Sequence, residues 1–250
     1  IDSVAEPSLQ LAVRGFEPLA VTDCLNYGNP ENKRIMGEFV ASLKGMNEMC
    51  RELSAPIISG NVSFYNETEG RNITSTPATG LVGLSTRETV PEETFTTAGE
   101  KVFLVTLDGC ATGGILQERA NGQTQAKGQL DPKKIAQFAR ELMGVKNAKS
   151  AKLVGRAGLG QTLARMCLTG VGASLNVQAS WLGGERLYEV VFAGGSELEN
   201  ELKKLSSVRV TELGLTGGDT LKLNDSLQVK LEELKTAYFN GWRRHFENLA

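Results

Sequence analysis

The chain has 250 residues, of which 40% are hydrophobic and 22% are charged, and its formal net charge is −2. This composition is typical of a folded globular protein, and the scattered lysine and arginine residues exclude the basic field that nucleic-acid binding needs. No apolar stretch approaches the roughly 20 residues of a membrane span and no signal peptide opens the chain, so we expect a cytoplasmic protein with neither nucleic acid nor membrane as a partner.

The first part of the sequence predicts alternating helices and strands. Helices are expected at residues 5–14 and 30–53, and strands at residues 18–22, 57–58 and 78–84. Apolar residues recur at three- and four-residue steps in both helical segments. Pro30 is expected in the first turn of the second helix, with Asn29 as its cap.

The second part of the sequence mixes strands and helices without strict alternation. Strands are expected at residues 102–107, 172–177, 187–193, 208–215, 221–223 and 227–229, and helices at residues 131–142, 159–167, 196–205 and 234–246. Residues 85–99, rich in charge and threonine, read as a connector. We therefore predict an α+β protein with two domains, residues 1–88 and residues 89–250.

Cysteine and histidine are sparse. Cys24, Cys50, Cys110 and Cys167 are far apart and form no CxxC pair, which disfavours a structural zinc site and predicts buried thiols in a reducing compartment. The single histidine, His245, lies in an apolar helical pattern, where a place on the helix surface is expected rather than catalysis.

Two polar stretches follow predicted strands. Asp23-Cys24-Leu25-Asn26-Tyr27-Gly28-Asn29-Pro30 offers a carboxylate and amides, and Ser59-Gly60-Asn61-Val62-Ser63-Phe64-Tyr65-Asn66-Glu67-Thr68-Glu69-Gly70 offers glycine, amides and hydroxyls. Such groups suit a phosphate, a hydrated cation or a small polar substrate, since glycine lets a ligand approach the backbone. Ordinary polar turns have the same composition, so residue types alone leave both interpretations open.

Together the two stretches resemble two motifs of the synthetase subunit of phosphoribosylformylglycinamidine synthase, also called formylglycinamide ribonucleotide amidotransferase. The resemblance continues through the helix between them and through Thr76-Pro77 to Leu84, and more loosely over the whole chain. It is closest to the second of the two homologous halves of that enzyme, the C-terminal half, beginning partway into its N-terminal domain. This implies the fold of the aminoimidazole ribonucleotide synthetase-like superfamily, with a truncated N-terminal domain and a mixed α/β C-terminal domain.

The resemblance also implies an activity. In that family, a ligase of purine biosynthesis uses ATP and Mg²⁺ to convert the amide of formylglycinamide ribonucleotide into an amidine, with ammonia from glutamine. Carried over by position, it implies that Asp23 and Gly60 contact ATP, that Asn61 is a magnesium ligand and that Ser63 contacts the substrate. The implied partners are the missing N-terminal half and a glutaminase subunit or domain.

The second domain departs from the family pattern. A Ser-Ala-His-Asp motif is replaced by Ser150-Ala151-Lys152-Leu153, a Gly-Gly-Ser-Glu motif by Gly113-Gly114-Ile115-Leu116, and a Phe-Gly-Glu-Ser motif by the region Leu182-Gly183-Gly184-Glu185-Arg186. We therefore assign no ligand and no catalytic residue in residues 101–250. The fragment alone is expected to be inactive, and exposed apolar area is expected to make it self-associate as a homo-oligomer.

Two alternatives remain open at this point. The chain is either a working part of the amidotransferase or a non-catalytic nucleotide-binding or scaffolding half with a degenerate second domain. A different member of the same superfamily, such as an aminoimidazole ribonucleotide, selenophosphate or hydrogenase-maturation enzyme, is a further alternative that the two long motifs disfavour.

Overall fold

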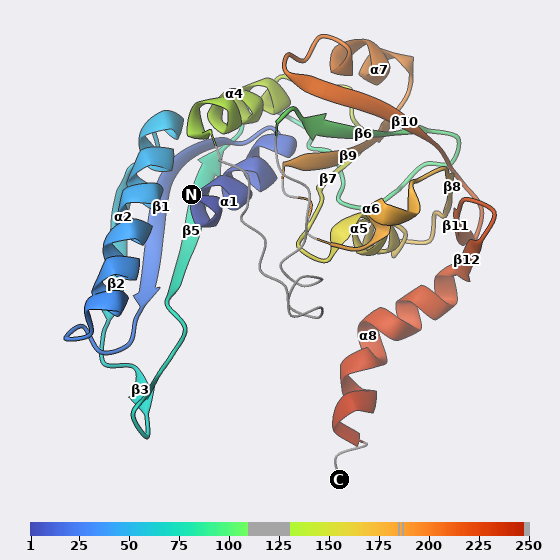
Figure 1. Cartoon of the computed structure of the whole chain (residues 1–250). Coiled ribbons are helices and arrows are strands. Elements are labelled where there is room, and N and C mark those ends of the chain that lie inside the picture. The colour runs from blue at the N-terminus through green and yellow to red at the C-terminus, as the bar shows by residue number, and fades with distance from the viewer. Residues whose placement is uncertain (110–130, 185, 187, 248–250) are drawn as a thin grey trace. The chain divides into compact units, whose positions relative to one another are not determined.

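The computed structural model describes residues 1–109, 131–184, 186 and 188–247, and these form two compact units (Figure 1). The first unit holds Ile1–Glu88 and the described residues of Leu130–Gly144. The second unit holds the described residues of Thr89–Gln129 and Val145–Ala250. Each unit combines helices with a sheet that contains antiparallel strand pairs, so the α+β class predicted from the sequence is confirmed.

The first unit is built on a three-stranded sheet with the strand order β2-β1-β5. Strand β1 pairs in parallel with β2 and antiparallel with β5, and a small hairpin, β3–β4, lies between β2 and β5 in sequence. The elements of this unit are α1 (Asp2–Val13), β1 (Glu17–Asn26), α2 (Lys33–Leu53), β2 (Ile57–Ser63), β3 (Glu67–Thr68), β4 (Arg71–Asn72), β5 (Thr76–Leu84) and α4 (Pro132–Met143).

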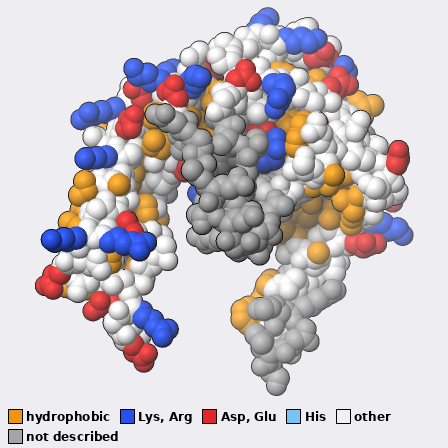
Figure 2. All heavy atoms as spheres, viewed as in Figure 1, with side chains coloured by type: hydrophobic (Ala, Val, Ile, Leu, Met, Phe, Trp, Pro, Cys, Tyr) orange, Lys and Arg blue, Asp and Glu red, His pale blue; other side chains and the backbone are white. Residues whose placement is uncertain are grey.

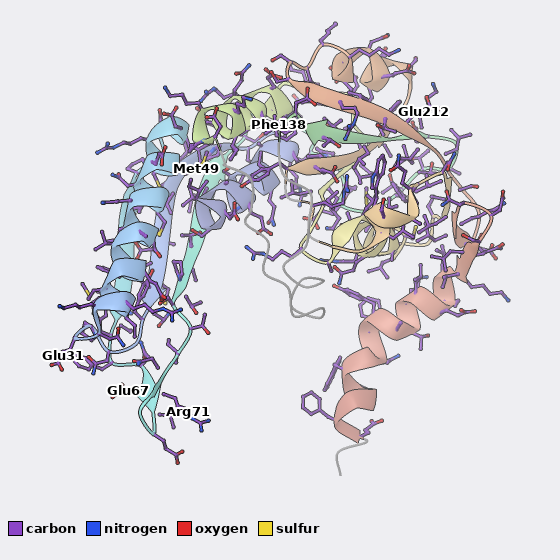
Figure 3. All side chains as sticks on the ribbon, in the orientation of Figure 1. Glu31, Met49, Glu67, Arg71, Phe138 and Glu212 are labelled. Atoms are coloured by element: carbon purple, nitrogen blue, oxygen red, sulfur yellow. The ribbon has the colours of Figure 1, made fainter. Side chains whose placement is uncertain are left out.

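Helices cover one side of this sheet. Helix α1 packs against β1 and β5, and α4 packs against α1 and α2. Alternate residues of β1, Val21 and Leu25, are buried on the covered side, as are Met49 of α2 and Phe138 of α4, which Figure 3 labels. The predicted apolar faces of the helices therefore form the core of this unit.

The opposite side of the sheet lacks such a cover within the described part of the first unit. Val82 and Leu84 of β5 are both 62% exposed, and Ile58 of the outer strand β2 is 69% exposed. Figure 2 shows hydrophobic side chains at the surface of this unit. We call this side, which carries Thr22, Cys24, Val82 and Leu84, the open side of the sheet.

The position of helix α4 is the main difference between the two compact units and the two domains predicted from the sequence. It was expected within residues 89–250, but its contacts place it with the first unit. Its residues Ile135, Phe138 and Leu142 are buried, and burial of this stripe against α1 and α2 explains the assignment. The units defined by contacts are therefore not continuous in sequence, because α4 belongs to the first unit, whereas the predicted domains have a single boundary after residue 88.

Helix α2 begins later than expected. Its cap is Asn32, whose side chain accepts a hydrogen bond from the Arg34 backbone N–H at 2.9 Å, and the prediction of Asn29 as the cap is wrong. Asn29 instead accepts from the Glu31 N–H at 2.9 Å and so forms a tight turn ahead of the helix.

The second unit is built on a seven-stranded sheet with the order β12-β11-β8-β10-β6-β9-β7. Its strands are β6 (Lys101–Leu107), β7 (Ser150–Leu153), β8 (Ala173–Leu175), β9 (Glu189–Gly194), β10 (Val208–Thr216), β11 (Thr220–Leu223) and β12 (Leu227–Lys230). Its helices are α5 (Gly158–Met166), α6 (Ala179–Leu182), α7 (Ser196–Leu202) and α8 (Leu231–Glu247). None of the helices in the described ranges combines the length and hydropathy that a membrane span requires.

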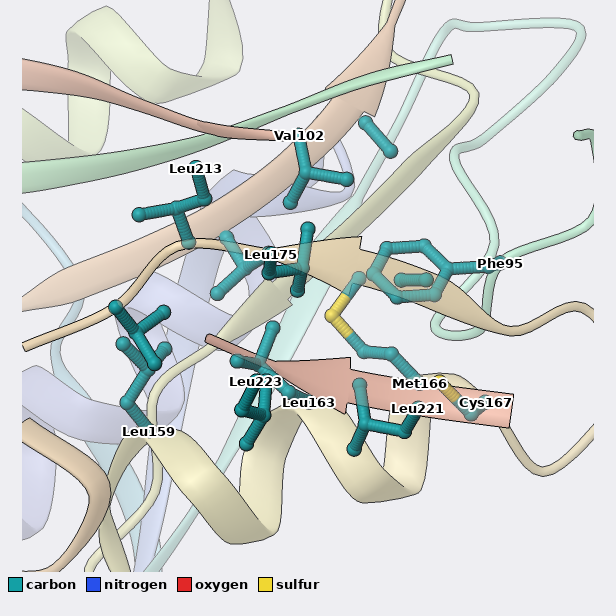
Figure 4. Close-up of a cluster of buried hydrophobic side chains, with 14 of the residues drawn as sticks. Phe95, Val102, Leu159, Leu163, Met166, Cys167, Leu175, Leu213, Leu221 and Leu223 are labelled. Carbon is teal, nitrogen blue, oxygen red and sulfur yellow. The ribbon is translucent and has the colours of Figure 1, made fainter. Parts of the chain in front are cut away.

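The core of the second unit joins the sheet to α5. Figure 4 shows a tightly grouped cluster of buried side chains from β6, α5, β8, β10 and β11 and from the segment before β6. Its labelled members are Phe95, Val102, Leu159, Leu163, Met166, Cys167, Leu175, Leu213, Leu221 and Leu223. This cluster brings together residues far apart in the sequence.

A network of charges joins α7 to the sheet. Glu199 accepts from Lys101 Nζ at 2.8 Å and from Lys203 Nζ at 2.6 Å, and these hydrogen bonds hold the pKa of Glu199 at about 2, below its ordinary 4.5. A carboxylate with a lowered pKa in the folded state stabilises the fold above its unfolded pKa, and this stabilisation is lost as the pH falls toward the folded pKa.

We therefore expect Glu199→Gln to flatten the acid end of the stability profile. Between about pH 4.5 and pH 2, the free energy of unfolding should fall less steeply in Glu199→Gln than in the unmodified chain. Urea denaturation at a series of pH values measures the difference. Glu197→Gln is the matched control, because Glu197 lies on the same helix and is exposed. Equal slopes for Glu199→Gln and the unmodified chain would contradict the prediction.

Candidate functional site

Asp23 and Gly60 lie side by side on neighbouring parallel strands. They are direct partners in the pairing of β1 with β2. A Cβ atom on residue 60 would lie only 2.6 Å from Cγ of Asp23, so the Asp23 carboxyl group occupies the space that a side chain at position 60 would need. Glycine is therefore required at position 60 for as long as Asp23 keeps this conformation.

Asn61 and Ser63 lie close together one step further along β2. Asn61 is the partner of Cys24 and Ser63 the partner of Asn26 in the same strand pairing. The side-chain amide of Asn61 donates from Nδ2 to Ser63 Oγ at 3.1 Å. The two side chains therefore share one side of β2 and act as one polar patch.

The four predicted site residues divide between the two sides of the sheet. Side chains alternate along a strand, and directly paired residues point to the same side. Asp23 shares the helix-covered side with the buried residues Val21 and Leu25, whereas Asn61 and Ser63 share the open side with Cys24. The structure thus forms two adjacent pairs, Asp23 with Gly60 and Asn61 with Ser63.

Both predicted loops begin as strand. The strand β1 was expected to end at residue 22 and β2 at residue 58, but they continue to Asn26 and Ser63. The reason is the continuous parallel pairing that runs from Thr22 with Ser59 to Asn26 with Ser63. The candidate residues are consequently held by a hydrogen-bonded ladder.

The segments beyond the two strands are bound to each other. The Tyr27 N–H donates to Ser63 O at 2.9 Å, and the Tyr65 N–H donates to Gly28 O at 3.0 Å. The rings of Tyr27 and Phe64 both pack beside Phe39 of α2, with centroids 5.1 Å from that of Phe39. These contacts fix the end of the β1–β2 pair against the beginning of α2.

Two further residues of this region were given no role from the sequence. Asn66 donates from Nδ2 to Tyr27 O at 2.9 Å and to Ser63 O at 3.0 Å, and Asn72 accepts from the Asn29 N–H at 2.6 Å. Asn66 lies within the second polar stretch, so its place there was a usable signal. Asn72 lies beyond that stretch, and its contact joins residues 43 positions apart, which sequence spacing does not indicate.

The oxygen atoms near Asn61 suit Mg²⁺ only if phosphate oxygens and waters supply most of its ligands. Within the described ranges no group of three His, Cys, Asp or Glu side chains is arranged to hold a metal ion. The Asn61 amide uses Nδ2 toward Ser63, which leaves its carbonyl oxygen Oδ1 as the candidate ligand. Mg²⁺ commonly keeps several waters and is bound by one or two protein oxygens together with substrate phosphates, so a single amide oxygen fits that arrangement.

The cysteines only partly follow the prediction. Cys50 and Cys167 are buried as expected, and burial raises the pKa of the Cys167 thiol to about 12. Cys24 is exposed on the open side of the sheet, so its predicted burial is wrong. Cys110 lies outside the described residues, as does the Gly113–Leu116 region.

In the second unit, the beginning of α5 is covered by the chain itself. A Cβ atom on Gly158 would lie 2.6 Å from Gly184 O, and one on Gly160 would lie 2.9 Å from Leu182 O. The backbone of residues 182–184 therefore packs closely against Gly158 and Gly160 and leaves no room for a side chain at either position. In β7, which replaces the expected Ser-Ala-His-Asp motif, Lys152 Nζ lies 2.6 Å from Glu93 Oε2.

Known proteins are similar to this chain in sequence and in fold. Residues 1–85 match the family model described as AIR synthase related protein, N-terminal domain. The chain is 32% identical over 250 aligned residues to phosphoribosylformylglycinamidine synthase subunit PurL of Campylobacter hominis, which covers 95% of the chain and 34% of the relative. It is 35% identical over 256 aligned residues to the PurL subunit of a Bradyrhizobium species, with 96% and 35% covered.

Solved structures show the same fold. The structure of Thermotoga maritima PurL complexed with ATP matches with a TM-score of 0.70 at 12% identity, over 93% of this chain and 40% of that one. Escherichia coli HypE, a hydrogenase maturation protein, matches with a TM-score of 0.69 at 14% identity, over 91% and 78%. At these identities the likeness concerns the fold alone, and both proteins share it.

The present chain spans about a third of the length of the curated relatives cited above. The resemblance predicted from the two polar motifs is confirmed by relatives that match nearly all of this chain. Over almost its whole length, the chain is similar to a segment of the phosphoribosylformylglycinamidine synthase subunit PurL, and residues 1–85 match the AIR synthase related N-terminal domain.

Proposed function

We propose that the chain contributes a nucleotide- and substrate-binding part to an ATP-dependent ligase of purine biosynthesis. That ligase converts formylglycinamide ribonucleotide into formylglycinamidine ribonucleotide with ammonia from glutamine. The observation that supports this most directly is that Asp23 lies against Gly60 where β1 pairs with β2. The hydrogen-bonded side chains of Asn61 and Ser63 lie next to them on β2. In this proposal Asp23 and Gly60 contact ATP, Asn61 holds Mg²⁺ and Ser63 contacts the ribonucleotide.

The chemistry of these groups supports the proposal. Phosphoryl transfer depends mainly on positioning and on neutralisation of charge, which an amide oxygen, a hydroxyl group and exposed backbone can provide together with Mg²⁺. Mg²⁺ would supply charge neutralisation between phosphate oxygens when it is bound. Ser63, as a hydroxyl that already pairs with Asn61, is suited to orient a phosphate or hydroxyl of the substrate.

The open side of the sheet supports a partner. Val82, Leu84 and Ile58 expose apolar surface there or at its border, and such surface is unusual unless another element covers it. We propose that the complementary N-terminal half of the enzyme, or a second copy of this chain, covers it. A glutaminase subunit or domain would supply ammonia, and the cytoplasm is the proposed compartment.

The proposal predicts that ATP stabilises the chain only when Mg²⁺ is present. A ligand at a concentration of 100 times its dissociation constant raises the free energy of unfolding by about 2.7 kcal/mol. Asn61→Ala is expected to weaken ATP binding about tenfold in the presence of Mg²⁺, because the proposed metal ligand is lost. Thermal unfolding with increasing ATP, with and without Mg²⁺, measures both effects.

Gln10→Ala provides the control for this experiment, because Gln10 is an exposed residue of α1 in the same unit and belongs to neither β1 nor β2. It should bind ATP as the unmodified chain does. A chain that ATP and Mg²⁺ leave unstabilised, or an Asn61→Ala variant with unchanged affinity, would overturn the proposal.

One observation favours the alternative, a half that binds nucleotide or serves assembly without catalysis. The Ser-Ala-His-Asp motif is replaced by Ser150-Ala151-Lys152-Leu153, and Lys152 Nζ lies 2.6 Å from Glu93 Oε2. Reconstitution with the complementary half separates the two functions. If the chain takes part in the reaction, Asn61→Ala abolishes amidine formation, and if the chain only supports assembly, activity is largely retained.

A further inference from the structure

The hairpin after β2 contacts the ends of both site strands through side-chain amides. Asn66 Nδ2 donates to Tyr27 O at 2.9 Å, beyond the end of β1, and to Ser63 O at 3.0 Å, at the end of β2. Asn72 Oδ1 accepts from the Asn29 N–H at 2.6 Å. One amide thus bridges the two strand ends, and the other holds the turn that leads into α2.

The backbone of the hairpin is shaped to place these amides. Glu69 and Gly70 both have positive φ, at 51° and 73°, as the tight turn of a two-residue hairpin requires. The pairs Glu67 with Asn72 and Thr68 with Arg71 close it, and Figure 3 labels Glu67 and Arg71 at this end of the unit. The hairpin therefore brings Asn72 next to Asn29, whose N–H donates to Asn72 Oδ1.

The close packing around Asn72 adds to this arrangement. A Cβ atom on Gly28 would lie 2.6 Å from Cβ of Asn72, so Asn72 lies directly over the backbone of residue 28. Gly28 O also accepts from the Tyr65 N–H at 3.0 Å. The turn at residues 27–29 is therefore held from two sides by the segment 65–72.

We propose that residues 66–72 form a clasp in which Asn66 and Asn72 are positioning residues for the candidate site. The clasp fixes the ends of β1 and β2 relative to each other. Ser63 is the last residue of β2 and bonds to Asn61, so the clasp sets where the pair Asn61 and Ser63 stands. Neither amide needs to touch a ligand for this role.

The Asn66 amide acts as a hydrogen-bond donor and the Asn72 amide as an acceptor. The same isosteric substitution, asparagine to aspartate, should therefore affect the two positions differently. Asn66 works as a donor, so Asn66→Asp removes the N–H groups that it uses. Asn72 works as an acceptor, so Asn72→Asp keeps the oxygen that it uses, whereas Asn72→Ala removes it. A general effect of added negative charge or of disturbed folding would instead make the two aspartate variants alike.

The binding part of the test rests on the proposed function. In the full chain with Mg²⁺, we expect Asn66→Asp and Asn72→Ala each to weaken ATP binding about tenfold, and Asn72→Asp to stay within about twofold of the unmodified chain. Arg71→Ala is the control on the same hairpin and should leave the affinity unchanged. Equal affinities for Asn66→Asp and Asn72→Asp would overturn the clasp.

Amide hydrogen exchange tests the clasp independently of ATP. The Asn29 N–H should exchange at least about tenfold faster in Asn72→Ala and at nearly the original rate in Asn72→Asp. If the unmodified chain does not bind ATP, the proposed function fails while this exchange measurement still decides the clasp. Unchanged exchange of the Asn29 N–H in Asn72→Ala would overturn the clasp even if ATP binds.

Discussion

Gly60→Ala is expected to weaken ATP binding by roughly 10- to 100-fold, which corresponds to about 1.4–2.7 kcal/mol of binding free energy. The new Cβ would lie 2.6 Å from Cγ of Asp23, so the carboxyl group must leave its place. Asp23 is itself a proposed nucleotide contact, and the change therefore disturbs both members of the pair. Calorimetric titration of the chain with ATP and Mg²⁺ measures the loss.

A double-mutant cycle shows whether the effect passes through Asp23. Gly60→Ala should reduce the free energy of unfolding in the unmodified chain, and the reduction should shrink by about 1–2 kcal/mol when Asp23 is already alanine. Gly37→Ala is the control: nothing lies within 4 Å of its added Cβ, and it lies inside α2. There alanine should stabilise the helix by about 0.5–1 kcal/mol. Strictly additive effects of Asp23→Ala and Gly60→Ala would refute the proposed contact.

Arg186→Met is expected to be the most destabilising single change considered for the second unit, with a loss of about 3–5 kcal/mol. Arg186 and Glu189 are 5% and 1% exposed, and the guanidinium group contacts both carboxylate oxygens at 2.5 and 2.6 Å. Removal of Arg186 would leave the Glu189 charge buried without its partner. Urea denaturation of the two chains gives the difference.

The partner mutation distinguishes a lost charge pair from lost packing. When Arg186→Met is combined with Glu189→Gln, no uncompensated charge is buried. The introduced amide would still offer an acceptor to Thr106, whose Oγ1 lies 2.8 Å from Glu189 Oε1 in the unmodified chain. This double variant should be at least about 1 kcal/mol more stable than Arg186→Met alone. Lys222→Met, which breaks the exposed contact with Asp225, should cost less than about 1 kcal/mol. A double variant less stable than the single one would contradict the argument.

Several helices could be predicted from the sequence because their periodic apolar positions are buried in the structure. The stripe of α2 and the stripe of α4, opened by its cap Asp131, were both predicted and both form buried faces. What periodicity could not provide was the partner of each stripe. Helix α4 packs with α1 and α2, which lie far earlier in the chain, and only tertiary contacts specify that choice.

Strand ends were the weaker part of the prediction. Polar residues at Asp23 and Ser59 suggested loops, yet hydrogen bonding to a neighbour keeps both stretches extended as far as Asn26 and Ser63. The short strand β7 was not predicted because its four residues carry too little pattern. Its place in the sheet comes from pairing with β9.

The candidate site was predictable as a set of residues but not as an arrangement. The two motifs named Asp23, Gly60, Asn61 and Ser63, and their assignment to ATP, metal and substrate stays a prediction. That Asp23 fills the space beside Gly60 follows from strand register, which residue types do not encode. The roles of Asn66 and Asn72 depend likewise on contacts across turns.

The position of β2 at the border of its sheet has a consequence for any ligand that reaches both pairs of residues. Its only partner in the three-stranded sheet is β1, so its far edge is unpaired there. Successive N–H groups of a strand point to alternate edges. A phosphate group lying across that border would meet the free edge of the backbone near Gly60 and the side-chain amide of Asn61 together, while the N–H groups on the other edge stay bonded to β1.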